Sequence, residues 1–127
     1  MNFTWRRSGT VFADPEVRTV CRETTAGWRV ECSGRITIDS SPGVHELLQR
    51  RLQSPACKTL VVDLYDVAYI DTSGLAMLME LLRAARLSGK ALQLSGLRGK
   101  PRYLLETSGM LHLFQEVDPV AQPGGVA

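Results

Sequence analysis

The chain has 127 residues, of which 44% are hydrophobic and 22% charged, and its formal net charge is +2. This length fits one domain with a real core, and the composition is typical of a globular protein rather than a disordered one. The small net charge, with basic residues scattered and no aromatic row between them, argues against a nucleic-acid-binding protein.

No stretch of the chain approaches the about 18 apolar residues of a membrane span, and the first residues lack the apolar core of a signal peptide. We therefore expect a cytoplasmic protein without direct membrane insertion. The three cysteines, Cys21, Cys32 and Cys57, lack the spacing of a zinc site or a disulfide framework. Cys21 and Cys32 fall at inward strand positions, which predicts small core residues.

The first half of the chain predicts a hairpin, a helix and a buried strand. Residues 1–16 show no sustained period and form an extension that could add an edge strand. Residues 17–22 and 28–33 alternate between apolar and polar side chains on either side of a turn, which indicates an antiparallel hairpin. A helix follows, with Ser41 as its N-cap and Pro42 at its first position, and it must end before Pro55. The apolar run from 58 to 64 is typical of an interior strand.

The second half adds two βα units. An apolar strand ending at Ile70 meets a polar turn, and a helix runs from about Ser73 to Ser88 with Gly89 as its C-cap. Residues 91–95 form a short strand, and a third helix runs from Pro101 to about Gly109. Residues 111–117 supply a last strand or a helical turn followed by a strand, and the Pro- and Gly-rich residues 118–127 are expected to be a disordered tail.

This order of elements predicts an α/β domain over residues 17–117. The sequence gives little support for an enzymatic function. His45 and His112 belong to no catalytic or metal-binding pattern, and no phosphate-binding loop or nucleophile elbow is present. We expect no catalytic residues, no metal and no cofactor.

The turn Asp71-Thr72-Ser73-Gly74-Leu75 is the remaining candidate for function. One interpretation is purely structural: Asp71 or Thr72 caps the following helix. The other is that an exposed hydroxyl at the start of a helix is a phosphorylation site. A phosphate is tolerated there because the helix amides and dipole favour anions, and it would alter binding rather than folding.

The turn and its surroundings resemble the STAS domain of bacterial anti-sigma factor antagonists. The resemblance rests on the run from Leu64 to Leu75, on Gly34-Arg35-Ile36, on the helix exit at 89–92 and on residues 104–110. It implies the STAS fold, a mixed sheet of four or five strands with helices packed mainly on one side.

The resemblance also implies partner switching. An unphosphorylated antagonist binds an anti-sigma factor, commonly a Ser/Thr kinase, and so frees a sigma factor; a PP2C-type phosphatase reverses the phosphorylation. Mapped here, the acceptor is Thr72, with Ser73 as the alternative. Several family members carry an acidic residue where this chain has Thr37, and the nearest carboxylate in the sequence is Asp39.

The partner surface expected from this comparison is the exposed side of 75–79 together with the loop 34–39. Its residues are Gly34, Arg35, Ile36, Thr37, Asp39, Asp71, Ser73, Gly74, Leu75, Ala76 and Met79. The alternative is a STAS module that is never phosphorylated and serves as a subunit of a stress-sensing complex or of a transporter. The sequence leaves open whether the chain forms a homodimer.

Overall fold

The computed structural model describes residues 10–13 and 15–117 as one sheet with helices. The strands are β1 (Thr10–Ala13), β2 (Val17–Glu23), β3 (Gly27–Ile36), β4 (Thr59–Ile70), β5 (Ala91–Ser95) and β6 (Gln115–Val117). The helices are α2 (Ser41–Gln53), α3 (Thr72–Leu87) and α4 (Gly99–Thr107), with a 3-10 turn, η1 (Leu111–Leu113). Most of the expected extension and the whole expected tail, residues 118–127, lie outside the described residues.

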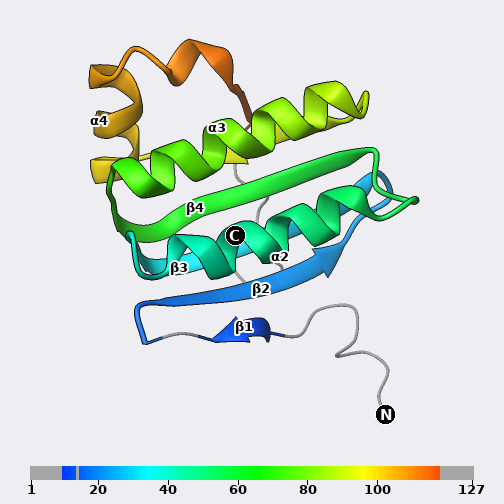
Figure 1. Ribbon diagram of the computed structural model, residues 1–127, viewed down its shortest axis with the longest axis horizontal. Helices are drawn as coiled ribbons and strands as arrows, with labels where there is room; N and C mark the ends of the chain where they lie inside the picture. Colours follow the sequence, from blue (N-terminus) through cyan, green and yellow to red (C-terminus); the bar gives the residue numbers. More distant parts are fainter. Residues whose placement is uncertain (1–9, 14, 118–127) are drawn as a thin grey trace, which may run out of the picture.

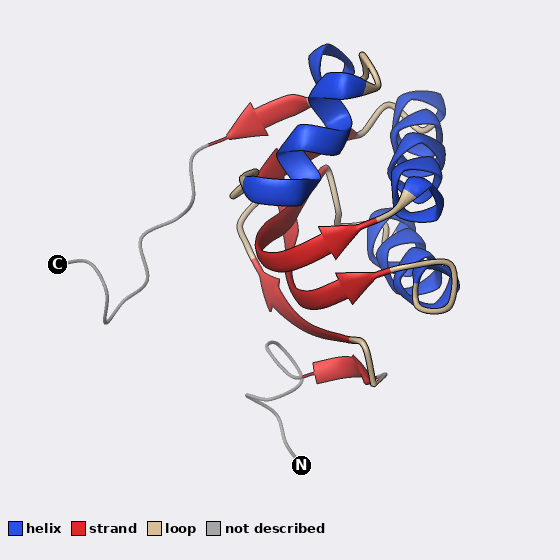
Figure 2. Ribbon diagram, turned by 90° about the vertical axis from the view of Figure 1, so that its left-hand side faces the viewer, coloured by secondary structure: helices blue, strands red, loops and turns tan. Residues whose placement is uncertain are grey.

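The strands follow one another across the sheet in sequence order. β1, β2 and β3 are antiparallel, whereas β4, β5 and β6 continue from β3 in parallel. Parallel neighbours need crossover connections, and α2, α3 and α4 supply them. Helices α2 and α3 lie side by side on one face, and α4 lies near the end of β4 (Figures 1 and 2). The predicted mixed α/β sheet is thus confirmed, with β1 as an edge strand before its five main strands.

The core lies between the sheet and the α2–α3 layer. Alternation along the strands sends Val30, Val62 and Leu94 toward the helices, where they are fully buried. The intervening residues point to the opposite face, where Arg29 donates to Asp63 over 2.6 Å in a largely buried ion pair. Cys21 and Cys32 are buried among the core residues, as their positions predicted, and Cys57 is buried as well.

Several predicted boundaries are wrong by a few residues. Ser40, not Ser41, is the N-cap of α2, so the helix begins at Ser41, one residue earlier than predicted; the Ser40 side chain makes no cap hydrogen bond, because its hydroxyl bonds within the preceding loop. Helix α4 begins at Gly99 instead of Pro101; a proline within the first turn costs nothing because amides there have no intrahelical acceptor. The apolar run at 58–64 and the strand predicted to end at Ile70 form one strand, β4, and β3 extends three residues beyond the predicted 33, to Ile36.

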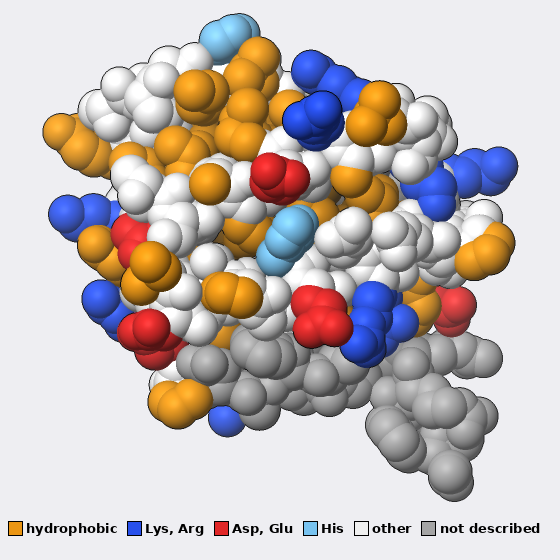
Figure 3. All heavy atoms as spheres, in the orientation of Figure 1, with side chains coloured by type: hydrophobic (Ala, Val, Ile, Leu, Met, Phe, Trp, Pro, Cys, Tyr) orange, Lys and Arg blue, Asp and Glu red, His pale blue; other side chains and the backbone are white. Residues whose placement is uncertain are grey.

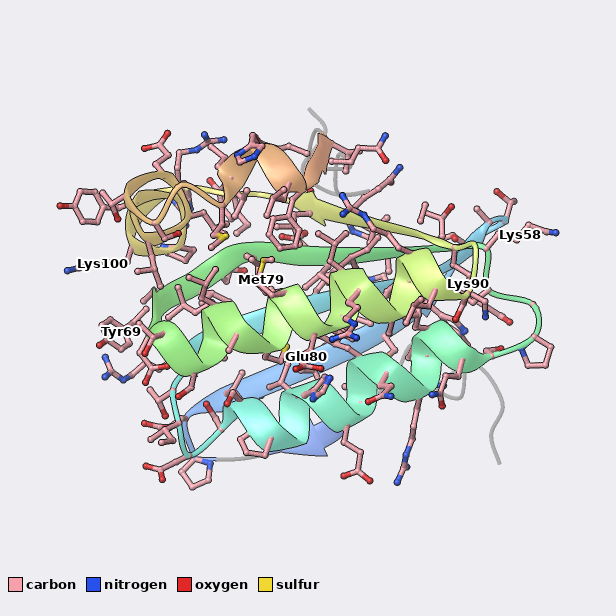
Figure 4. The ribbon with its side chains drawn as sticks, turned by 45° about the horizontal axis from the view of Figure 1, so that its top comes forward. Lys58, Tyr69, Met79, Glu80, Lys90 and Lys100 are labelled. Atoms are coloured by element: carbon pink, nitrogen blue, oxygen red, sulfur yellow. The ribbon has the colours of Figure 1, made fainter. Side chains whose placement is uncertain are left out.

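Lys90 ties α2 to the loop between α3 and β5. Its Nζ donates to the carbonyl oxygens of Leu52 (2.5 Å) and Ser54 (3.1 Å), at the carboxyl end of α2 where acceptors lack helical partners. Figure 4 shows Lys90 beside that end of α2, while Lys58 lies farther out. A cation at a helix C-terminus also interacts favourably with the helix dipole.

We expect Lys90→Met to lower the free energy of unfolding by about 1–3 kcal/mol, because it removes two charge-assisted hydrogen bonds. Lys58→Met, at an exposed lysine of the same end, should change it by less than about 0.5 kcal/mol. Urea unfolding of both variants measures the difference. Equal stability of the two variants would show that the Lys90 contacts contribute nothing.

Candidate functional site

The candidate site forms where two parallel strands end. Ile36, at the end of β3, pairs with Ile70, at the end of β4. The loop 37–40 and the turn 71–75 therefore leave the sheet at the same edge and lie side by side. The N–H of Asp71 continues the pairing by donating to the carbonyl of Ile36 (3.2 Å).

Asp71 joins the turn to the loop through both of its carboxylate oxygens. Its Oδ1 accepts the N–H groups of Ser73 (2.9 Å) and Gly74 (3.2 Å), the N-cap arrangement expected for this residue. Its Oδ2 accepts the N–H of Ile38 (3.1 Å) from the neighbouring loop. The cap of α3 and the conformation of the loop are thus held by one side chain.

The loop has an internal hydrogen-bond network. The N–H of Thr37 donates to Ser40 Oγ (2.9 Å), and the Ser40 hydroxyl donates to the carbonyl of Arg35 (2.9 Å). Thr37 Oγ1 accepts the N–H of Asp39 (3.2 Å) and donates to Glu16 Oε1 (2.5 Å). The nearest carboxylate in sequence was Asp39, but the fold brings Glu16, from before β2, into contact with Thr37.

The two hydroxyls of the turn differ in accessibility. Thr72 is exposed at the first position of α3, whereas Ser73 is half-buried. Neither hydroxyl makes a hydrogen bond within the part of the chain that the structure describes. Gly74 is buried, and a Cβ built on it would lie 2.4 Å from Cγ1 of Ile70, so this position accepts no side chain without movement. Of these two hydroxyls, that of Thr72 is the more accessible to an enzyme.

A groove runs from Thr72 along the side of α3 that faces the chain after α4. It contains the predicted surface residues Leu75, Ala76 and Met79. Its other lining residues are Glu80, Arg83 and Met110, which the sequence analysis missed. Hydrophobic side chains gather on the upper part of the face of the molecule that Figure 3 shows. Met79 lies on the upper side of α3 in Figure 4. The helical spacing of Glu80 and Arg83 after Ala76 could have indicated them, whereas Met110 comes from a distant segment.

The loop 34–39 contributes less surface than its sequence suggested. Ile36 is fully buried and Thr37 is only 8% exposed, so both offer little surface, and their contact with a partner stays a prediction. Arg35 and Asp39 are exposed; the Arg35 guanidinium lies 4.4 Å from the Tyr69 ring centroid and 4.0 Å from Glu16 Oε2. Ile38, which lies in the predicted loop 34–39 but not among its individually named residues, is 69% exposed beside the turn.

The remaining reactive side chains do not form a second site. Burial raises the pKa of the Cys32 thiol to about 12 and also raises the pKa of Cys21 and Cys57, which keeps all three thiols protonated and unreactive at neutral pH. Among residues 10–13 and 15–117, no group of three or more His, Cys, Asp or Glu residues is arranged to hold a metal ion. None of the helices described there is long and apolar enough to cross a membrane.

A family model described as "Mlab, STAS domain" matches residues 20–115. The chain belongs to the STAS domain family. A STAS fold is also seen in an anti-sigma factor antagonist from Mycobacterium paratuberculosis, which is 18% identical, with 86% of this chain and 92% of that chain covered and a TM-score of 0.67. The antagonist SpoIIAA in its unphosphorylated form is 10% identical over 89% of each chain, with a TM-score of 0.61. A sulfate transporter family protein from Wolinella succinogenes is 21% identical, covering 67% of this chain and 68% of that one, at a TM-score of 0.57.

The recognition of a STAS fold from the sequence is thus confirmed. At these identities the solved structures show a shared fold and leave the role of each site residue as a prediction. In this STAS domain the exposed Thr72 lines the groove, and Asp71 caps the helix that carries it.

We expect Asp71→Ala to destabilise the STAS domain by about 1–3 kcal/mol, because it removes an N-cap and leaves the Ile38 amide without its acceptor. Asp66→Ala, at an exposed carboxylate of β4, serves as the control and should cost less than about 0.5 kcal/mol. Hydrogen exchange adds a local test: the amides of Ile38, Ser73 and Gly74 should exchange faster in Asp71→Ala. Unchanged exchange at Ile38 would mean that Asp71 does not hold the loop.

Proposed function

We propose that this STAS domain is an anti-sigma factor antagonist that is switched off by phosphorylation of Thr72. It binds an anti-sigma factor of the Ser/Thr kinase type, which frees a sigma factor, and a PP2C-type phosphatase restores the active form. The observation that carries the proposal is the position of Thr72: an exposed hydroxyl at the first residue of α3, at one end of an apolar groove.

The groove has the chemistry of a protein-binding surface. Leu75, Ala76, Met79 and Met110 supply its apolar part, and Glu80 and Arg83 supply charges. Partner-binding surfaces commonly combine an apolar centre with a polar rim. The proposed contact surface consists of this groove together with Arg35, Ile38, Asp39 and the exposed part of the turn.

A phosphate on Thr72 would act on binding more than on folding. It adds about −1.5 to −2 charges at pH 7, next to helix amides that favour an anion. In an interface the same group would have to lose its water, which is costly for a charge without a matched partner. The modified domain would stay folded while its groove no longer packs against an apolar surface.

The first experiment is phosphorylation of the full chain by the kinase-type anti-sigma factor of the same genome, with ATP and magnesium. We expect one phosphate on the wild type and none on Thr72→Ala. The matched control is Thr107→Ala, because Thr107 is also exposed and also precedes Ser-Gly, but at the end of α4. Loss of the phosphate in Ser73→Ala alone would move the acceptor to Ser73.

Binding provides the second readout of the same proposal. The unmodified wild type and Thr72→Ala should bind the anti-sigma factor, and phosphorylation should raise the Kd of the wild type by about tenfold or more, a loss of about 1.4 kcal/mol or more. Absence of both phosphorylation and binding would reject the antagonist function.

A second function is favoured by the family model, whose description names Mlab, and by the transporter protein among the similar structures. In that case the same turn and groove would bind a transporter subunit constitutively, without phosphorylation. Affinity purification separates the two functions, because an anti-sigma factor should co-purify in the first case and a transporter ATPase in the second. Both proposals include that the chain is not an enzyme and that it works in the cytoplasm.

A further inference from the structure

Ile38 is an exposed apolar side chain in the loop beside the turn. The large hydrophobic residues exposed in the described chain are Ile38 (69%), Tyr65, Leu87 (79%) and Tyr103. The tyrosines carry a polar hydroxyl, and Leu87 is the last residue of α3, at the opposite end of the helix from the turn. Isolated exposed apolar residues are common, so exposure alone assigns nothing to Ile38.

The rigidity of its backbone distinguishes Ile38. Its N–H is held by Asp71 Oδ2 (3.1 Å), and the residues on both sides are fixed by the Thr37 and Ser40 side chains. Two backbone hydrogen bonds close the turn. The N–H of Ser40 (3.1 Å) and the N–H of Ser41 (2.7 Å) both donate to the carbonyl of Thr37. A side chain presented by such a loop loses little backbone entropy on binding, which is the property of a preorganised anchor.

Within the part of the chain that the structure describes, the charged residues of this loop and its hydrogen-bond partners are mainly carboxylates. Asp39 follows it in sequence and is exposed, Asp71 holds its amide, and Glu16 contacts Thr37. Arg35 is the cation among these neighbours, and it lies close to Glu16 and Tyr69. An apolar side chain bordered by carboxylates is complementary to an apolar pocket bordered by Lys or Arg.

We propose that Ile38 is the apolar anchor of the partner interface and that it enters a pocket with a basic rim on the partner protein. This inference rests on the proposed function for the identity of that partner, but its chemistry follows from Ile38 and the carboxylates around it.

The test places the photoreactive residue p-benzoylphenylalanine at position 38 or at position 87 of the full chain in its own cells. Leu87 is the matched control, because it is at least as exposed but lies at the far end of α3. We expect a discrete crosslinked protein from position 38 and none from position 87. That protein is then purified and titrated with wild type, Ile38→Ser and Leu87→Ser.

Support for the inference requires that Ile38→Ser raises the Kd by about tenfold or more while Leu87→Ser leaves it within about twofold. The Kd of the wild type should also rise with ionic strength, because the rim contacts are charged. Circular dichroism and urea unfolding confirm that both variants are folded.

Absence of a crosslink at position 38, or an unchanged Kd for Ile38→Ser, overturns the inference. A crosslinked transporter ATPase that loses affinity for Ile38→Ser would retain Ile38 as the anchor and reject the antagonist function. An anti-sigma factor that binds the wild type and Ile38→Ser equally would support the antagonist function and reject Ile38 as the anchor.

Discussion

The candidate site depends on the Asp71 carboxylate, which bonds in two directions. One oxygen accepts two amides of the first turn of α3, and the other accepts the Ile38 amide from the loop after β3. These segments are more than thirty residues apart in the sequence. They meet because β3 and β4 are parallel neighbours and end at the same edge of the sheet, so that a short side chain spans the gap. The site is therefore a property of strand order as well as of the turn motif.

Helix α3 serves the core and the surface with different parts of its apolar arc. Met77, Leu78 and Leu81 are buried in the core, whereas Leu75 and Met79 are partly buried and line the groove. The groove thus contains the apolar residues of α3 that the core does not bury. The same helix thus packs into the core on one side and exposes apolar area on the other, without a separate binding element.

The sequence predicted the elements of the fold well because their signals are local. Alternation defined the β2–β3 hairpin, Asp71 was recognised as a good cap type, and Gly89 with its φ of 69° ends α3 as expected. The site was predicted less completely, in part because some of its missing members come from other segments. Met110 reaches the groove from the chain after α4, and Glu16 reaches Thr37 from before β2. Ile36 and Ile38 are two residues apart, so the sequence pattern alone does not separate them. Ile36 pairs with Ile70 in the sheet and is buried, whereas Ile38 lies in the loop after β3 and is exposed.

The turn separates its structural contacts from its exposed hydroxyl. Asp71 satisfies the amides of Ser73 and Gly74, so the helix start does not need the Thr72 hydroxyl. Gly74 permits the close approach of α3 to Ile70, where a Cβ would lie only 2.4 Å from a side-chain carbon. Between these two fixed positions, Thr72 is exposed and its hydroxyl is not used by the described chain. A chemical change at Thr72 would therefore leave the cap and the packing intact. A reversible surface switch requires this arrangement, because a modification that broke the cap would destabilise the helix instead of changing the affinity for a partner.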